Sequence, residues 1–184
     1  MVLMSNRWVY GSLIAAGMLA VGQQVPVNRL APYVSSPQNV VDRMLEVAKL
    51  KPGETVYDLG SGDGRVLITA AQKYGAKAVG IEISRKEVAA SQERIKLLKL
   101  DNRAQVIEGD LLKADISQAD VVTLYLLTQS NEMLRPHLEK SLRPGTRVVS
   151  HDYPIRGWTP VLVEKIDAYR RAHQLYLYEV PAPK

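Results

Sequence analysis

The order of apolar and polar positions divides most of this 184-residue chain into alternating strands and helices. Short apolar runs are typical of strands covered on both faces, and apolar positions that recur every three or four residues are typical of helices. The predicted strands cover residues 55–59, 77–81, 104–107, 120–126 and 146–150, and two further β-rich runs, 161–166 and 174–180, form a predicted hairpin. The predicted helices cover residues 37–48, 65–74, 84–100 and 130–142.

This alternation predicts an α/β domain with a doubly wound, Rossmann-like sheet of seven strands, mostly parallel, with an antiparallel hairpin at the C-terminus. Two helix starts have signals of their own. Ser36 before Pro37 is typical of an N-cap followed by the first helical residue, and Ser84 with Glu87 is a capping box. In such a sheet, ligands bind at the carboxyl ends of the strands.

A glycine-rich turn follows the first predicted strand and contains Asp58, Gly60, Ser61, Gly62 and Gly64. Glycines let a backbone approach a ligand closely, and amide groups at the start of the following helix favour an anionic group. Glu82 comes at the end of the second strand, where a carboxylate can accept hydrogen bonds from ribose hydroxyls. The two segments together predict a pocket for a cofactor that contains adenosine.

The choice of cofactor depends on Asp58 and on the spacing of the glycines. A dinucleotide site favours G-x-G-x-x-G and a turn that faces a pyrophosphate, whereas this chain has G-x-G-x-G preceded by a carboxylate that would repel one. S-adenosylmethionine has an amino group that Asp58 would attract and a carboxylate that backbone amides can meet. We therefore favour S-adenosylmethionine over a dinucleotide or a purely structural turn.

The third predicted strand ends in a similar way, with Glu108-Gly109-Asp110-Leu111. An acidic residue at this position can accept a hydrogen bond from the adenine amino group, so Asp110 is a candidate for that contact. Leu111 and Ile83 are candidates to flank the base. A Gly-Asp pair by itself is an ordinary turn, and its meaning here comes from its place after the third strand.

The composition removes several kinds of chemistry. The chain has no cysteine, which excludes disulfides and the thiol nucleophile of cytosine-C5 methyltransferases. His137, His151 and His173 lie far apart in the sequence without metal-ligand spacing, so no metal site is predicted. The net charge of +5 comes largely from one helix and the loop after it, which we interpret as a solvated face rather than a nucleic-acid or membrane patch.

From Pro37 onward, these motifs resemble those of class I S-adenosylmethionine-dependent methyltransferases. A closer resemblance, to the small protein-lysine methyltransferases of the adenine nucleotide translocase and ATP synthase c-subunit type, rests on Pro32-Tyr33-Val34-Ser35-Ser36, on Arg147-Val148-Val149-Ser150 and on Tyr153-Pro154 with Trp158-x-Pro160. It implies a bacterial relative of that group, a seven-strand methyltransferase sheet, and a lysine in a protein partner as methyl acceptor. His151-Asp152 and Leu124-Tyr125-Leu126-Leu127 differ from the pattern of the group.

A lysine acceptor needs a channel in which burial beside aromatic rings lowers the pKa of the substrate ammonium. The candidates for the walls of this channel are Tyr33, Tyr125, Tyr153 and Trp158, with His151 or Asp152 as the proton acceptor. Three of these residues have a plainer alternative: Tyr125 can be a core residue of its strand, Trp158 can pack the loop, and His151 can have a structural role.

Two other functions stay open at this point. Thr128-Gln129-Ser130-Asn131 differs from the [DNS]-P-P-[YFW] motif of adenine and glutamine methyltransferases, which weakens those two assignments. A small-molecule methyltransferase would have the same cofactor half. A cofactor-binding module without catalysis would differ only in its acceptor channel.

Residues 1–27 form a separate apolar segment, a signal or an anchor, and residues 28–184 form the predicted methyltransferase domain. Arg7 precedes an uncharged run over residues 8–22, a pattern shared by secretory signals, short membrane anchors and apolar helices packed on a domain. S-adenosylmethionine is made in the cytosol, so an exported enzyme would lack its cofactor. We therefore expect an uncleaved membrane anchor with the catalytic domain in the cytosol.

Overall fold

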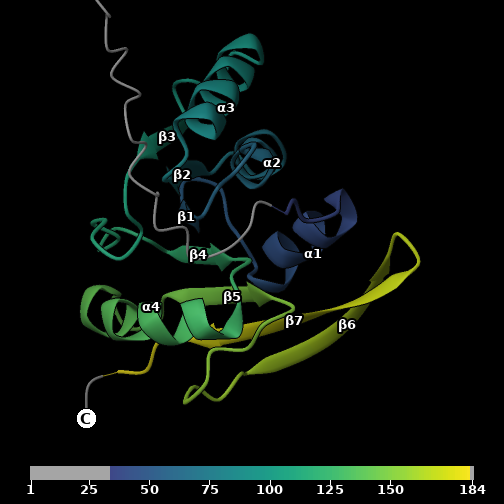
Figure 1. The fold of residues 1–184 in the computed structure, drawn as a ribbon, viewed down its shortest axis with the longest axis vertical. Helices are drawn as coiled ribbons and strands as arrows, with labels where there is room; N and C mark the ends of the chain where they lie inside the picture. Colours follow the sequence, from purple (N-terminus) through teal and green to yellow (C-terminus); the bar gives the residue numbers. More distant parts are fainter. Residues whose placement is uncertain (1–33, 183–184) are drawn as a thin grey trace, which may run out of the picture.

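The computed structural model describes residues 34–182 (Figure 1). The strands in this range are β1 (Thr55–Leu59), β2 (Lys77–Glu82), β3 (Ala104–Glu108), β4 (Val121–Leu124), β5 (Arg147–His151), β6 (Leu162–Ala168) and β7 (Arg171–Glu179). The helices are α1 (Gln38–Val47), α2 (Arg65–Tyr74), α3 (Arg85–Leu97) and α4 (Thr128–Ser141).

The strands form one sheet in the order β3-β2-β1-β4-β5-β7-β6 (Figure 1). β1 to β5 run parallel to one another, β7 runs antiparallel to β5, and β6 runs antiparallel to β7. The doubly wound sheet with its C-terminal hairpin is therefore confirmed. The strand order reverses between β1 and β4, which is where open sheets of this kind bind ligands.

Apolar side chains form a core on each face of the sheet. On one face, α1, α2 and α3 pack against alternate strand residues such as Val56, Val121 and Val149. On the other face, α4 packs against their neighbours in the strands, among them Val122 and Val148. Successive strand residues point to opposite faces, so cover on both faces explains why the central strands carry apolar residues on both of their faces.

The fourth strand is shorter than its apolar run predicts. β4 ends at Leu124 because its pairing with β1 stops where β1 ends, at Leu59. Leu126 is nevertheless buried, and its side chain lies 3.5 Å from the position that a Cβ on Gly60 would occupy. The apolar run therefore continues past the strand to cover the glycine turn, and α4 begins at Thr128 rather than Ser130.

The start of α1 also differs from the prediction. The sequence predicts Ser36 as the N-cap, but Pro37 occupies that position. The Ser36 hydroxyl instead makes a buried hydrogen bond of 2.9 Å with His151 Nδ1 at the end of β5. A long-range contact thus takes the side chain that a local rule assigns to the cap. Ser84 is the N-cap of α3 as predicted, but its side chain makes no capping hydrogen bond, so the predicted capping box with Glu87 does not form. That helix ends at Leu97 rather than Leu100.

Within residues 34–182, no helix combines the length and the apolar character needed to cross a membrane. The predicted apolar run over residues 8–22 lies outside the described residues, and so does Tyr33.

Candidate functional site

The turn between β1 and α2 has a backbone shape that favours glycine. Gly60, Gly62 and Gly64 have φ angles of +89°, +50° and +74°, in the left-handed region that side chains with a Cβ disfavour. Gly64 is the N-cap of α2, and a Cβ on it would lie 3.2 Å from Ser91 Cβ of α3. The glycines therefore determine the path of the chain at the carboxyl end of β1.

Three amides of this turn are engaged by β2. Gly60 and Ser61 donate to the carbonyl oxygen of Ile81 at 2.8 and 3.2 Å, and Gly62 donates to a carboxylate oxygen of Glu82 at 3.0 Å. These amides fix the turn on the neighbouring strand. The Gly62 amide thus meets an anionic group of the protein itself, and the glycines let a ligand approach the main chain.

The turn lies so close to β2 that the strand needs a glycine at the contact. A Cβ on Gly80 would lie 2.5 Å from Ser61 Oγ and 2.7 Å from Leu67 Cδ1. Ser61 Oγ is buried, with no hydrogen-bond partner among residues 34–182. The Ser61 side chain therefore packs on the strand, and Ser61 is also one of the residues that line the cavity described below.

Glu82 ends β2 with its carboxylate held by two backbone amides. Gly62 donates to Oε2 at 3.0 Å, and Ser84 donates to Oε1 at 2.8 Å. An ionised carboxylate has about four lone-pair sites, so Glu82 can still accept two further donors. This fixed acceptor lies at the position where the sequence predicts a ribose contact.

Asp58 is buried on β1, and Thr123 Oγ1 of β4 donates to its Oδ1 at 2.7 Å. Burial raises the pKa of Asp58 to about 7, the hydrogen bond from Thr123 opposes the rise, and the charges of Glu82 and Asp63 add to it. A cation beside Asp58 would favour the ionised carboxylate and lower this pKa again. The position is therefore suited to the ammonium group of a ligand.

One cavity brings the ends of β1, β2 and β3 together. Its lining offers buried and half-buried acceptors, apolar side chains for a flat base, and a close approach to the main chain. Asp110 Oδ1 accepts the amide of Leu112 at 3.0 Å, which fixes the turn after β3. The chemistry of this set fits S-adenosylmethionine. The predicted cofactor residues that line the cavity are Asp58, Gly60, Ser61, Gly62, Glu82, Ile83, Asp110 and Leu111.

Arg65, the first residue of α2, lines the same cavity and is absent from the sequence-based prediction. Its guanidinium donates to both carboxylate oxygens of Asp63 and, at 2.5 Å, to the carbonyl oxygen of Ser36. Burial raises the pKa of Asp63, but the hydrogen bonds from Arg65 to its carboxylate outweigh burial and hold the pKa below its usual value. Arg65 thus links the segment before α1 to the glycine turn. In the sequence, the Asp63-Gly64-Arg65 triplet is the signal that indicates the ion pair between Asp63 and Arg65.

Among the acceptor candidates within residues 34–182, Tyr125 is the one that lines the cavity. It lies just past the end of β4 rather than in the core of the strand. Its ring stacks on His151 with centroids 3.8 Å apart, and the Tyr153 ring lies 6.2 Å away. Burial raises the pKa of the Tyr125 hydroxyl, and the negative charge of Asp152 adds to the rise. His151 and Tyr153 therefore support a tyrosine at the cavity.

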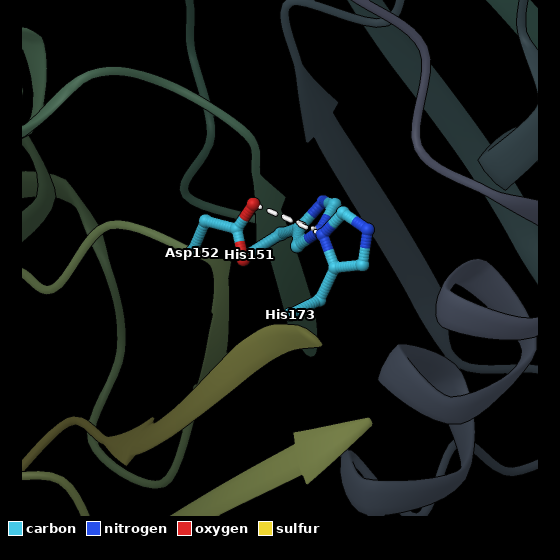
Figure 2. Close-up of side chains that lie close together, drawn as sticks. All are labelled: His151, Asp152 and His173. Carbon is cyan, nitrogen blue, oxygen red and sulfur yellow. Dashed lines mark hydrogen bonds and ion pairs between the residues drawn. The ribbon is translucent and has the colours of Figure 1, made fainter. Parts of the chain in front are cut away.

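His151 and His173 are far apart in sequence but come together between β5 and β7 (Figure 2). The antiparallel register pairs His151 with Leu175, which brings His173 to the same end of the two strands. His151 Nε2 lies 2.8 Å from His173 Nδ1, and Asp152 Oδ2 lies 3.0 Å from the same His173 atom. Burial lowers the pKa of His151 to about 4, so its ring is neutral at pH 7. Spacing along the sequence gives no sign of this cluster.

Trp158 lies apart from these residues. Its ring meets Tyr178 of β7 edge-on with centroids 5.6 Å apart, and its Nε1 donates to Glu139 of α4 at 2.9 Å. Tyr178 belongs to the core on the α4 side of the sheet. The placement agrees with the packing alternative for Trp158.

Comparison with known proteins finds a family match over residues 58–162, to the ANTKMT methyltransferase domain. A protein-lysine N-methyltransferase of Saccharolobus islandicus is 49% identical over 81% of this chain and 93% of its own length. The adenine nucleotide translocase lysine N-methyltransferase of Mus musculus is 32% identical over 77% of this chain, and the match spans 61% of the mouse protein.

A solved structure, an RNA methyltransferase from Salinibacter ruber in complex with S-adenosyl-L-homocysteine, matches with a TM-score of 0.76 and 43% identity. The match covers 82% of this chain and 96% of that one. S-adenosylhomocysteine is the demethylated form of the cofactor inferred from the cavity. Family model, relatives and site agree: the chain belongs to the ANTKMT methyltransferase family and is a class I S-adenosylmethionine-dependent methyltransferase.

Proposed function

We propose that this enzyme transfers the methyl group of S-adenosylmethionine to the side-chain amine of a lysine in a protein. The observation that carries the proposal is Tyr125, an aromatic wall of the cavity held by stacking on His151. The names of the Saccharolobus and mouse relatives, both lysine methyltransferases, support the same acceptor.

The cofactor, when bound, supplies an electrophilic methyl group on a positively charged sulfur. Asp58 is suited to hold its ammonium group by charge, and Glu82 is suited to accept hydrogen bonds from its ribose. Asp110 is the acceptor for the adenine amino group, between the apolar side chains of Ile83 and Leu111. Each of these residues lines the one cavity.

A lysine reacts only as a free amine, so its ammonium must first release a proton to solvent. The nitrogen–carbon bond then forms as the carbon–sulfur bond breaks, and S-adenosylhomocysteine is the leaving group. The Tyr125 ring excludes water from one side of the cavity, and desolvation favours the neutral amine. His151 and Tyr153 stack on Tyr125 and do not themselves line the cavity, so we assign them the role of positioning the Tyr125 ring, which would hold the lysine amine for in-line attack.

The acceptor can be identified with cofactor carrying a labelled methyl group, incubated with the enzyme and a cell extract. We expect label in protein, removed by protease but not by ribonuclease, and methyllysine on mass spectrometry. Tyr125→Ala should lower kcat more than Tyr125→Phe, because the phenylalanine ring preserves the wall. Label confined to small molecules would contradict the proposal, and absence of any transfer would indicate a binding module without catalysis.

RNA is a second candidate acceptor because the Salinibacter protein, 43% identical, is described as an RNA methyltransferase. The same extract separates the two candidates. Label that survives protease and is released by ribonuclease would favour RNA and overturn the lysine proposal. The cofactor side of the site would be unchanged in either case.

The role of Glu82 is testable apart from the acceptor. Glu82→Gln should weaken binding of S-adenosylhomocysteine by about 1–3 kcal/mol, the usual loss when a buried polar partner is removed. Glu108→Gln is the matched control, because Glu108 is paired with Glu82 in register at the end of β3 but forms an exposed ion pair with Arg85. Equal affinities of the two variants in calorimetry would remove Glu82 from the site.

We infer that the enzyme is attached to a membrane through residues 8–22, with residues 28–184 on the cytosolic side. The uncharged run after Arg7 supports the attachment, and the cytosolic supply of S-adenosylmethionine supports the orientation. The full chain should sediment with membranes and resist carbonate extraction, whereas a chain without residues 2–22 should stay in the supernatant. Recovery of both in the supernatant would contradict the inference.

A further inference from the structure

Three side-chain atoms with lone pairs converge at the end of β5, beside the cofactor cavity (Figure 2). His151 Nε2 lies 2.8 Å from His173 Nδ1, which lies 3.0 Å from Asp152 Oδ2, and the carboxylate oxygen lies 3.5 Å from His151 Nε2. The three side chains are at most 8% exposed. They are held together by the antiparallel register of β5 and β7.

Hydrogen bonds among the three side chains satisfy their lone pairs poorly. His173 Nδ1 carries at most one hydrogen, yet it faces both His151 Nε2 and the Asp152 carboxylate. If the hydrogen points to Asp152, the lone pair of His151 Nε2 stays without a full hydrogen bond. If His173 Nδ1 is bare, its lone pair lies 3.0 Å from a carboxylate oxygen. A cation between the three atoms would satisfy these lone pairs in both cases.

We propose that His151 Nε2, His173 Nδ1 and Asp152 Oδ2 form a binding site for a divalent transition metal of the zinc type. Two ligand atoms about 2.0–2.1 Å from a tetrahedral zinc are about 3.3 Å apart, which lies within the range of the three separations here. Two imidazoles and one carboxylate favour Zn²⁺, Co²⁺ or Ni²⁺, whereas Mg²⁺ and Ca²⁺ prefer all-oxygen ligands.

The outer contacts orient the ligands as such a site requires. Ser36 Oγ lies 2.9 Å from His151 Nδ1, so a hydrogen on Nδ1 can be held there while Nε2 stays bare. Gln174 N donates to Asp152 Oδ1 at 3.0 Å, which leaves Oδ2 for the metal. Partners of this kind fix the tautomer and the direction of metal ligands. Asp152 itself has a left-handed φ of 61°, a costly backbone shape that aims its carboxylate at the histidines.

Arg171 is the competitor for this site. Its guanidinium lies 2.7 Å from Asp152 Oδ2, the oxygen assigned to the metal, and its side chain is 59% exposed. Repulsion between a dication and the guanidinium would weaken metal binding, but the exposed arginine can turn away into solvent. Loss of the Arg171 charge should therefore strengthen metal binding, an effect that a purely structural histidine pair would not show.

The place of the site gives it a role beside the acceptor. His151 stacks on Tyr125, which lines the cavity, and Asp152 lies 3.4 Å from the Tyr125 hydroxyl. A bound metal would fix β7 to the end of β5 and hold the Tyr125 ring at one wall of the cavity. This inference rests on the cluster alone and does not depend on lysine as the acceptor.

Metal binding can be measured on the full chain after dialysis against a chelator. We expect one equivalent of Co²⁺ to bind with the visible absorption of a low-symmetry, four- or five-coordinate ion, and one equivalent of Zn²⁺ to displace it in calorimetry. His173→Ala and Asp152→Asn should each weaken binding at least tenfold, and Ser36→Ala about 10–100-fold. Arg171→Gln should tighten it.

His137→Ala is the matched control, because His137 is the third histidine and contacts the carbonyl oxygen of Ala114 instead. It should bind the metal as the unaltered chain does. Circular dichroism verifies that each variant is folded. If His173→Ala is unfolded, the two single variants Asp152→Asn and Arg171→Gln decide the question. A full chain that binds neither ion at one equivalent, or a folded Asp152→Asn chain with unchanged affinity, would overturn the proposal.

Discussion

At the scale of single residues, Asp58 combines burial with the ligand-binding role proposed above. Its carboxyl has a pKa of about 7 in the unliganded chain because of burial, and an ammonium group beside it favours ionisation. From the proposed contact we therefore expect Asp58 to lose a proton when the cofactor binds. The aspartate before the glycine-rich turn thus predicts a proton release that can be measured in solution.

Binding of S-adenosylhomocysteine should depend on pH through Asp58. The ligand favours the ionised carboxylate, so affinity should rise about tenfold per pH unit up to pH 7 and level off above it. Calorimetry in buffers of different ionisation enthalpy should show one proton released near pH 6. Asp58→Asn should bind weakly and without this slope, and a slope retained in the variant would assign the proton to another group.

The same carboxyl affects the stability of the unliganded chain in the opposite direction. Its folded pKa is raised above the usual value of 3.8, so between pH 4 and pH 7 the folded state holds a proton that the unfolded state has lost. This stabilising effect is complete below pH 4 and is lost as the pH rises through 7. Asp58→Asn should therefore unfold at a higher temperature than the unaltered chain at pH 8. Equal melting temperatures at pH 8 would show that burial costs Asp58 little.

At the scale of elements, the contact between the glycine turn and β2 depends on a residue without a side chain. Gly80→Ala would place a methyl group 2.5 Å from Ser61 Oγ and 2.7 Å from Leu67 Cδ1. We expect a loss of about 1–3 kcal/mol in the free energy of unfolding, the usual cost of overpacking. Gly109→Ala is the control, because its nearest neighbour would be 3.9 Å away. Chemical denaturation that gives equal losses for both variants would contradict this packing.

Arg147 joins β5 to the end of α1. Its guanidinium donates to the carbonyl oxygens of Ala48 and Lys49 at 2.5 and 3.0 Å and to a carboxylate oxygen of Glu54 at 2.7 Å. Lysine cannot reproduce this fork, so Arg147→Lys should cost about 1–2 kcal/mol in the free energy of unfolding.

Arg85→Lys is the control for Arg147→Lys, because Arg85 is 87% exposed in its ion pair with Glu108. Its loss should be too small to resolve, because water screens an exposed ion pair. Thermal or urea unfolding of the two variants measures the difference. Arg147→Lys with no greater loss than the control would show that one hydrogen bond to the α1 end suffices.

Element types could be predicted from the sequence because each strand and helix is marked by its own local pattern. Element ends were less predictable where distant contacts decide them. Leu126 is apolar because it covers the glycine turn, so the run gave no sign that β4 stops at Leu124. Ser36 has the residue type of an N-cap, but its hydroxyl meets His151 across the fold.

At the scale of the whole molecule, the two halves of the site differ in how far sequence reasoning reaches. That Asp58, Glu82 and Asp110 line one cavity could be predicted because each lies at or just past the carboxyl end of a strand, and parallel strands end at one edge. The acceptor half depends on the register of β5 and β7 and on the turn after β4. No local pattern reports that register, so the approach of His173 to His151 appears only in the fold.

The hydrogen bonds from Gly60 and Ser61 to Ile81 mean that the main chain of the cofactor site is set before any ligand arrives. Little ordering entropy is then lost on binding, which favours tight association. The amino, ribose and adenine groups that we assign to Asp58, Glu82 and Asp110 are common to S-adenosylmethionine and S-adenosylhomocysteine. A rigid site that holds only these shared groups would bind the product as tightly as the methyl donor, so we expect release of S-adenosylhomocysteine to limit turnover.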